Sequence, residues 1–282
     1  CALAPFGIEL TGVDLAAPLP EGLADRLPGL LDRHKLILLR DQRLNEDQQA
    51  DFCAHFGPVL GARGEYRQLS SDGNLGAGPL SWHSDLAFTE EPFQAISLLA
   101  TKVNDGQSWT AFADGTRPLP EELAERLKDR DALTVISMIQ THRTVGYNVP
   151  DFLPHMVRPA VITHPRTAEP VLYVSDMQTA RIEGLAKVES DALLQDLFAH
   201  LYDPANVYRH HWRNGDLVIW DNVALSHSRC DLAGMHPRKM QRVCCARRSF
   251  FDLLPNFSLD DPRIAAWGKG EVLVLEDSQG DA

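Results

Sequence analysis

The segment Trp82-His-Ser-Asp-Leu-Ala-Phe88 places a histidine and an aspartate two residues apart in a strand-like run. Side chains alternate between the two faces of a strand, so His83 and Asp85 are expected to project from the same face. An imidazole beside a carboxylate supplies two ligands of a metal site, and a third ligand must then come from elsewhere in the chain. The sequence therefore predicts a fold that brings a distant segment to this strand.

The best candidate for the third ligand is His227, which follows the run Gly215-Asp-Leu-Val-Ile-Trp-Asp-Asn222. In this run an apolar strand ends in a polar turn and delivers a histidine 142 residues after Asp85 (227 − 85). Two neutral imidazoles and one carboxylate on one face of a metal form the facial triad of non-haem iron(II) oxygenases. A bare His-x-Asp pair is a weak signal, and its ordinary interpretation is a surface or capping pair. The surrounding motifs must therefore show whether this pair binds a metal.

Length and composition are those of a globular protein. The chain has 282 residues, of which 44% are hydrophobic and 23% charged, and it is expected to form one domain over residues 1–282. The net charge of −12 argues against nucleic acid and against an anionic membrane surface as partners. An acidic small-molecule substrate stays compatible with this charge, because a few arginines in a pocket can dominate the local field. A homo-oligomer is neither predicted nor excluded.

The cysteines indicate a reducing compartment. Their number is odd and no two have the CxxC spacing of a zinc site: Cys1, Cys53, Cys230, Cys244 and Cys245. Cys244 and Cys245 are adjacent in an apolar stretch and are expected to point to opposite faces of a strand. No apolar run approaches the ~20 residues of a membrane-spanning helix, and no signal peptide is recognised. We therefore expect five free thiols in a cytoplasmic enzyme.

The pattern of apolar residues predicts a mainly β chain with flanking helices. A helix is expected after Asn45, which forms a capping box with Gln48, and it should end near Gly57. Two further helices are predicted over 121–128 and 191–201, the latter with Ser190 as its cap. The predicted strands are paired short strands within 6–15, a buried strand over 36–39, and strands over 82–88, 95–99, 171–174, 216–220 and 242–251.

Several short motifs occur in a fixed order along nearly the whole chain. They are Gly7-Ile-Glu-Leu-Thr-Gly-Val-Asp14, Leu39-Arg-Asp-Gln42, His55-Phe-Gly57, Trp82-His-Ser-Asp85, Thr110-Ala-Phe-Ala-Asp114, Leu119-Pro120, Thr163-His-Pro165, Leu172-Tyr-Val174, Gly215–Asn222, and His227 with the arginines after it. In this order they resemble the taurine dioxygenase (TauD/TfdA-like) family of Fe(II)- and 2-oxoglutarate-dependent oxygenases. The ordered set is far more specific than any one motif.

The resemblance implies a fold and a set of roles. The fold is a double-stranded β-helix, or jelly roll, with helices outside. His83, Asp85 and His227 match the iron ligands, and Thr110 and Arg238 match the residues that bind the distal carboxylate of 2-oxoglutarate. Arginine is well shaped to bind a carboxylate with two parallel hydrogen bonds. Arg242 matches a second arginine, four residues on, which reaches either the other end of the co-substrate or an anionic group of the substrate.

The resemblance implies less about the substrate. Tyr66, Arg67, Tyr147 and Asn148 lie in two loop regions that cover the substrate in this family. The arginines favour a small anionic or zwitterionic molecule. The chain departs from the family pattern at two points. The run Gln107-Ser-Trp-Thr110 replaces the family's Gly-Gly-Asp-Thr-like turn, so this turn is built differently. A histidine that helps some members to bind a sulfonate has no secure equivalent, which argues against a taurine-like substrate.

The resemblance also implies a reaction, in which 2-oxoglutarate and O2 are consumed with release of succinate and CO2. Related halogenases replace the carboxylate ligand with a small residue, so the presence of Asp85 predicts oxygenation, with hydroxylation, desaturation and oxidative rearrangement all open. Two alternatives stay open as well. A zinc hydrolase or isomerase would not need Thr110 and Arg238 and would work without O2, and an inactive binding module would be expected to have lost a ligand. We assign core or surface roles to His164 and His210.

Overall fold

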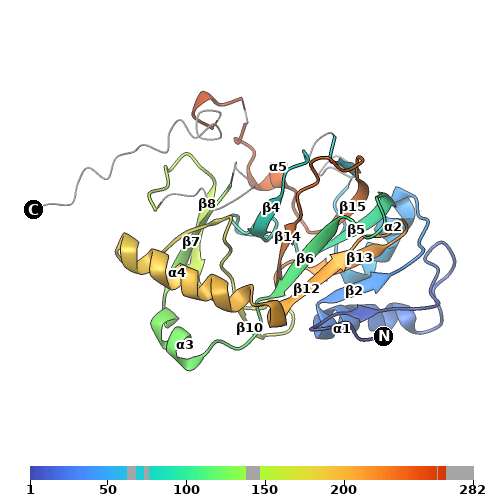
Figure 1. The fold of residues 1–282 in the computed structure, drawn as a ribbon, viewed down its shortest axis with the longest axis horizontal. Helices are drawn as coiled ribbons and strands as arrows, with labels where there is room; N and C mark the ends of the chain where they lie inside the picture. The colour runs from blue at the N-terminus through green and yellow to red at the C-terminus, as the bar shows by residue number, and fades with distance from the viewer. Residues whose placement is uncertain (62–67, 73–75, 138–146, 259, 265–282) are drawn as a thin grey trace, which may run out of the picture.

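The computed structural model describes residues 1–61, 68–72, 76–137, 147–258 and 260–264 (Figure 1). Its largest sheet has the strand order β1-β2-β13-β5-β15-β3, in which only β1 and β2 run parallel. Its strands are β1 (Ile8–Glu9), β2 (Leu36–Leu39), β3 (Gln68–Ser70), β5 (Ala95–Lys102), β13 (Leu217–Asp221) and β15 (Lys239–Cys245).

A second, four-stranded antiparallel sheet has the order β12-β6-β14-β4. Its strands are β4 (Leu80–His83), β6 (Trp109–Asp114), β12 (Val207–His211) and β14 (Leu225–Arg229). The register sets His227 opposite His83 and Arg229 opposite Thr110. The sheet ladder therefore joins segments that are more than a hundred residues apart in sequence.

The apolar residues of the large sheet separate by alternation. In β2, Leu36 and Leu38 pack with residues of the four-stranded sheet, whereas Ile37 and Leu39 pack with the helices on the other face. Full burial of each such side chain contributes about 2 kcal/mol, so a register shift of one residue would be costly. The two sheets therefore form a sandwich with the core between them, and the mainly β jelly-roll prediction is confirmed.

Helices cover the outer face of the large sheet. In α1 (Leu23–His34), Leu23, Leu27 and Leu31 are four residues apart and all buried. In α2 (Glu46–Cys53), the predicted capping box is present, since Asn45 Oδ1 accepts from the Gln48 amide at 2.8 Å and Gln48 Oε1 accepts from the Asn45 amide at 3.0 Å. A 3-10 turn, η1 (Ala54–Phe56), follows α2 and ends at Gly57.

The middle of the chain builds a smaller layer beside the sandwich, on the left in Figure 1. Helix α4 packs its buried residues Leu193, Leu194, Leu197, Phe198 and Leu201 into this layer. The elements are α3 (Glu121–Leu127), β7 (Asp131–Val135), β8 (His155–Pro159), β9 (Val161–Thr163), β10 (Pro170–Leu172), β11 (Thr179–Ile182), α4 (Lys187–Leu201) and the 3-10 turn η2 (Pro204–Asn206). A last short helix, α5 (Phe250–Leu253), lies near β4 in Figure 1, and its Phe250 and Leu253 pack against the core between the sheets.

Four predicted boundaries were wrong. The strand predicted over 82–88 ends at His83, and the chain then turns, with Leu86 at φ 60°. The strand predicted over 242–251 ends at Cys245, and Ser249 then caps α5. Helix α4 begins at Lys187, so Ser190 is a buried residue inside it rather than its cap. The strand predicted over 171–174 spans Pro170–Leu172, because the chain leaves the β10–β9 ladder there.

The prediction that the cysteines are thiols is confirmed, since none of the five forms a disulfide. Cys244 packs in the core between the sheets and Cys245 packs toward the helices, as their adjacency in a strand predicts. Among the described residues, no helix has the length and apolar character that crossing a membrane requires.

Candidate metal and co-substrate site

The three predicted ligands meet in space. His83 ends β4, His227 lies opposite it in β14, and their ring centroids are 4.2 Å apart. Asp85 Oδ1 lies 3.5 Å from His83 Nε2 and 3.8 Å from His227 Nε2. One ligand atom from each side chain lies within 4.8 Å of the others. Two strands and one turn therefore bring two nitrogens and one carboxylate oxygen to a single point.

Local electrostatics keep His227 and Asp85 in the protonation states that bind metals. Burial, together with the neighbouring His83, lowers the pKa of His227 to about 3. Burial alone would raise the pKa of Asp85, but the neighbouring side chains of His83, His227 and Arg242 bring it well below its usual range. His227 is thus neutral and Asp85 is ionised at physiological pH.

The orientation of His83 also fits a metal ligand. Its Nδ1 lies 2.8 Å from the carbonyl oxygen of Ser81, which can only accept, so Nδ1 carries the proton. The lone pair of Nε2 then faces Asp85 and His227. A backbone carbonyl that fixes the tautomer in this way is a common partner of metal-binding histidines. Two imidazole nitrogens and one carboxylate oxygen suit a divalent first-row metal such as iron(II).

The ligands open onto a large cavity of about 660 Å³. This volume lies in the range that holds a small organic molecule together with a co-substrate. Most of its described wall is apolar. Among the described residues, its ionisable lining residues besides the two histidines are Asp85, Arg229, Arg238 and Arg242. The cavity can therefore hold an anion at defined points and an apolar group elsewhere.

Thr110 and Arg238 lie together on the wall of this cavity. Arg238 Nη2 lies 3.5 Å from Thr110 Oγ1, which also accepts from Trp212 Nε1 at 2.9 Å. The guanidinium stacks over the Trp212 ring at 5.2 Å. Among the described residues, Arg238 has no acidic partner and its Nη1 is buried without a hydrogen bond. Burial, with the charge of Arg229, lowers the pKa of Arg238 to about 9, so an incoming carboxylate would stabilise this cation.

Arg242 lies at the metal end of the same wall. Its Nη1 is 3.5 Å from Asp85 Oδ2, and its side chain lines the cavity together with that of Arg238. The predicted common orientation of these two arginines is therefore observed, because they are four residues apart on an extended segment. One guanidinium stands beside the ligand cluster, and the other stands beside Thr110.

Known proteins resemble this chain in both sequence and fold. The family described as "Taurine catabolism dioxygenase TauD, TfdA family" matches residues 2–244 of this chain. The chain belongs to this family. Members of the family use Fe(II), 2-oxoglutarate (α-ketoglutarate) and O2, and the resemblance seen in the sequence is confirmed. The chain is accordingly a dioxygenase of the 2-oxoglutarate-dependent class.

Two curated relatives are similar over most of their length. The (S)-phenoxypropionate/alpha-ketoglutarate-dioxygenase of Sphingobium herbicidovorans is 30% identical over 249 residues, which cover 79% of this chain and 86% of the relative. The alpha-ketoglutarate-dependent sulfate ester dioxygenase of Pseudomonas putida is 30% identical over 266 residues, which cover 86% of each chain.

Solved structures of the family have the same fold. The crystal structure of AAD-2 in complex with Mn(II) and N-oxalylglycine matches with a TM-score of 0.71 and 27% identity, over 87% of this chain and 96% of that one. The crystal structure of a taurine dioxygenase from Burkholderia xenovorans matches with a TM-score of 0.70 and 26% identity, over 86% of each chain.

The four residues predicted to contact substrate are not placed in the large cavity by the described structure. Tyr66 and Arg67 lie outside the described residues. Tyr147 and Asn148 do not line the large cavity. The Tyr147 hydroxyl donates to the carbonyl of Leu185, and its ring lies under the Arg181 guanidinium. The substrate role predicted for Tyr147 and Asn148 gains no support from this geometry.

Sequence reasoning missed Arg229 and Asn222. Arg229 lines the cavity opposite Thr110 in the ladder, is almost fully buried, and donates to the carbonyl oxygens of Gly76 and Gly78. Nothing in the sequence distinguishes it from an exposed arginine. Asn222 bonds the backbone of Asp85, and its place in the polar turn before His227 was the signal available.

The histidines assigned to the core or surface are structural. His164 is buried, and its Nε2 lies 3.0 Å from Asp221 Oδ2. His210 is buried, and its Nε2 lies 3.0 Å from Asp216 Oδ2. Neither lines the large cavity.

Proposed function

We propose that His83, Asp85 and His227 hold iron(II) and that Thr110 and Arg238 bind the distal carboxylate of 2-oxoglutarate. The observation that carries this proposal is the cluster of two histidine nitrogens and one carboxylate oxygen within 4.8 Å, open to a cavity of about 660 Å³. The buried Arg238 supports the co-substrate part, since a cation without an acidic partner among the described residues requires an anion.

Bound iron(II), together with 2-oxoglutarate and O2, supplies the oxidising power that converts the co-substrate to succinate and CO2 and oxidises a substrate C–H bond. The chain supplies position and shielding from water. His83 and His227 offer ring nitrogens, and Asp85 adds one negative charge. Arg238 and Thr110 fix the far end of 2-oxoglutarate, which orients its reactive end. The carboxylate of Asp85 supports oxygenation over halogenation, and we propose hydroxylation, with desaturation or oxidative rearrangement as variants.

Arg242 is proposed to bind an anionic group of the substrate. It stands beside Asp85, away from the Thr110–Arg238 pair. An ion pair with a partly buried arginine gives both orientation and affinity. The alternative, in which Arg242 binds the metal-proximal end of 2-oxoglutarate, differs in one measurable respect, since its loss would then weaken binding of the co-substrate rather than of the substrate.

The rest of the cavity favours an apolar substrate body. Aromatic and long aliphatic side chains line it, among them Phe88, Phe93, Ile136, Met177, Phe250, Phe251 and Phe257. Asp85, which we assign to the metal, is the one carboxylate among the described lining residues, so none of these residues offers a carboxylate to a substrate ammonium. We therefore propose that the substrate is an anion with an aryl or alkyl body, and we prefer this class to zwitterions. The named relatives, which act on phenoxypropionate and sulfate esters, support this class.

We also propose that residues 1–282 form one domain of a cytoplasmic enzyme with a small molecule as its partner. The free cysteines support a reducing compartment. The net charge of −12 supports the absence of nucleic-acid and anionic membrane partners.

The test of this function is succinate release by the iron-loaded protein with 2-oxoglutarate and O2. We expect aryloxy acids or alkyl sulfates to stimulate release, and taurine to leave it at the basal level. Asp85→Ala should abolish the stimulation while the far-ultraviolet circular dichroism stays that of the native protein. Full activity of Asp85→Ala would refute the assignment. Substrate conversion without O2 would instead favour a hydrolase or isomerase.

A further inference from the structure

Asp85 is held differently from the two histidines. His83 and His227 lie in paired strands, so the sheet ladder fixes their backbones. Asp85 lies in the turn after β4, and the next residue, Leu86, has φ 60°. A branched side chain rarely adopts this left-handed conformation. The backbone of Asp85 therefore needs partners other than a neighbouring strand.

A single side chain, that of Asn222, supplies these partners. Asn222 Oδ1 accepts from the Asp85 amide at 2.9 Å, and Asn222 Nδ2 donates to the Asp85 carbonyl at 3.0 Å. The same Nδ2 donates to the carbonyl of Phe93 at 2.9 Å. Asn222 is fully buried. Its primary amide thus meets both polar backbone groups of one residue, as a paired strand would.

The turn that carries Asn222 is itself firmly held. Asp221 Oδ1 accepts from the amides of Val223 and Ala224 at 2.9 and 3.0 Å. Asp221 Oδ2 accepts from His164 at 3.0 Å and from Arg166. This turn leads directly into β14, which carries His227. Asn222 therefore ties the position of Asp85 to the strand of another ligand.

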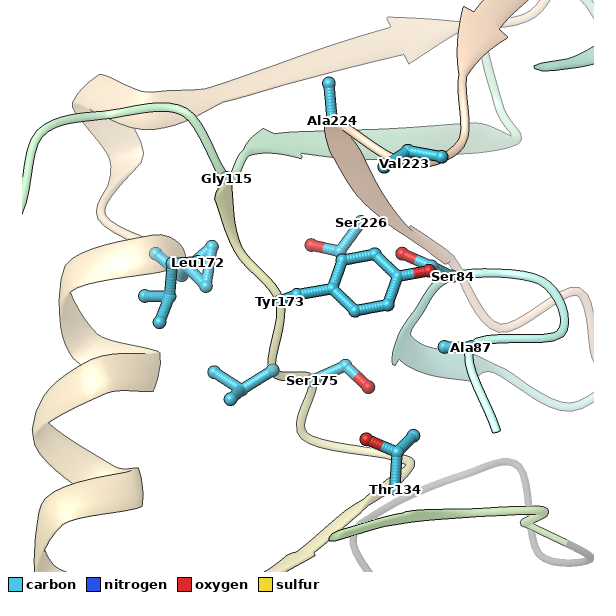
Figure 2. A pocket seen from close by; sticks show the side chains of 12 residues that line it. Ser84, Ala87, Gly115, Thr134, Leu172, Tyr173, Ser175, Val223, Ala224 and Ser226 are labelled. Carbon is cyan, nitrogen blue, oxygen red and sulfur yellow. The ribbon is translucent and has the colours of Figure 1, made fainter. Parts of the chain in front are cut away.

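The other side of the Asp85 turn is packed. Figure 2 shows Ser84 and Ala87 of the turn lining a small cavity together with Val223, Ser226 and the Tyr173 ring. The cavity left among these residues has a volume of about 10 Å³. That is at most the space of one water molecule, so the turn cannot retreat in this direction. The two Asn222 bonds restrain the peptide groups on either side of Asp85.

We propose that Asn222 is a positioning residue that orients Asp85 toward the metal. It bonds the backbone on both sides of the Asp85 side chain and lines neither the metal cluster nor the large cavity. The inference rests on the proposed function, since it takes Asp85 as a metal ligand. Loss of a residue that orients a metal ligand typically weakens metal binding by about 10- to 100-fold.

The test compares Asn222→Asp with a matched control, Asn206→Asp. Aspartate is nearly isosteric with asparagine but lacks the N–H donors, and its second oxygen would face the carbonyls of Asp85 and Phe93. Asn206 is also buried, and its Nδ2 donates to the carbonyls of Asp114 and Leu201 at 3.0 and 2.8 Å. Each substitution removes two buried amide donor bonds, so each lowers stability, but only the first should disturb metal binding.

The first measurement is the dissociation constant of Mn(II) from the metal-free protein, by electron paramagnetic resonance of the free ion. We expect a roughly 10- to 100-fold increase for Asn222→Asp and a change of less than about threefold for Asn206→Asp. Folded Asn222→Asp protein that binds Mn(II) within about threefold of the native value would overturn the inference. The proposed function fails instead if the native protein does not bind Mn(II), or if Asp85→Ala binds it equally well.

A second measurement needs no variant. The amide of Asp85 should exchange slowly with solvent in the folded, metal-free native protein, because Asn222 Oδ1 accepts its proton. Exchange as fast as that of an exposed amide would show that the bond is absent and would overturn the inference. Should Asn222→Asp fail to fold, the comparison of Asn222→Ser with Asn206→Ser makes the same distinction with a milder change.

Discussion

At the scale of single residues, the site is defined by buried charges that face few opposite charges. Arg229 and Arg238 line one part of the cavity, and burial lowers the pKa of both. An isolated buried cation lowers the stability of the empty protein. Its retention in a cavity is explained by an anionic ligand, which here is proposed to be the co-substrate.

A first prediction concerns Arg238→Met. Methionine keeps the packing against Trp212 but removes the buried charge. We expect the free energy of unfolding of the metal-free protein to stay unchanged or to rise by about 1 kcal/mol, and the affinity for 2-oxoglutarate to fall by roughly 10- to 100-fold or more. Urea unfolding and calorimetry measure the two effects.

Arg248→Met is the control for this prediction. Arg248 pairs with Glu90 at 3.1 Å on the surface, so its replacement should change neither quantity by more than about 0.5 kcal/mol. A strongly destabilised Arg238→Met protein with native co-substrate affinity would contradict the proposed role.

The residue types of the site could be predicted from the sequence, although one reason given for them was wrong. His83 and Asp85 do meet, but Asp85 reaches the cluster through a turn and not through strand alternation. A leucine at φ 60° has no sequence signature, because any non-glycine residue is rare there. Arg229 was missed because burial of an arginine depends on tertiary packing.

At the scale of secondary-structure elements, local signals predicted some elements and missed others. Helix α2 was predicted because its capping box is a local hydrogen-bond pattern. Helix α1 was missed, since Pro28 and Gly29 inside it are residues that usually interrupt helices. Its three buried leucines, packed on the large sheet, provide the stabilisation that the local sequence lacks.

The turn between β13 and β14 yields a prediction about pH. Burial alone would raise the pKa of Asp221, but the hydrogen bond from His164 and the charge of Arg166 lower it below its ordinary value of 3.8. As the pH falls, Asp221 is therefore protonated at a higher pH in the unfolded chain than in the folded protein. The stabilisation of the fold by ionised Asp221 is fully present above about pH 4, and it is lost as the pH falls through the pKa of Asp221 in the folded protein.

Asp221→Asn should remove this pH-dependent contribution. We expect a loss on the order of 2 kcal/mol in unfolding free energy at pH 7 and a shallower decline of stability below about pH 4 than in the native protein. Urea unfolding at a series of pH values measures both. Asp196→Asn is the control, because Asp196 pairs with Arg126 on the surface at 2.6 Å. Its free energy of unfolding at pH 7 should stay within about 0.5 kcal/mol of the native value. An unchanged acid decline in Asp221→Asn would contradict this assignment.

At the scale of the whole molecule, the β-sandwich holds His83 and His227 on one sheet, with Asp85 in the turn after β4. Arg238 and Arg242 lie on or beside β15 of the other sheet. The ordered motifs predicted this architecture because they extend along nearly the whole chain. The substrate could not be predicted as fully, because the apolar wall is assembled from segments far apart in sequence. Phe88, Ile136 and Phe250 meet only in the folded protein.

The separation of the two arginines predicts a separation of their effects. Arg242→Gln should raise the KM for an apolar anionic substrate by roughly 10- to 100-fold, since a hydrogen bond to a charged group is worth about 1.5–3 kcal/mol. The KM for the co-substrate should change by less than about threefold. Steady-state succinate release, with each ligand varied in turn, measures both constants. The reverse pattern would assign Arg242 to the co-substrate.

The most direct test of the metal and co-substrate site is an anaerobic titration of the Fe(II)-loaded protein with 2-oxoglutarate, followed by visible absorption. We predict the weak charge-transfer band of an iron-bound 2-oxo acid, absent in Asp85→Ala and absent in Arg238→Met at the same co-substrate concentration. Folded, iron-bound native protein that shows no band at saturating 2-oxoglutarate would contradict the assignment of His83, Asp85, His227 and Arg238.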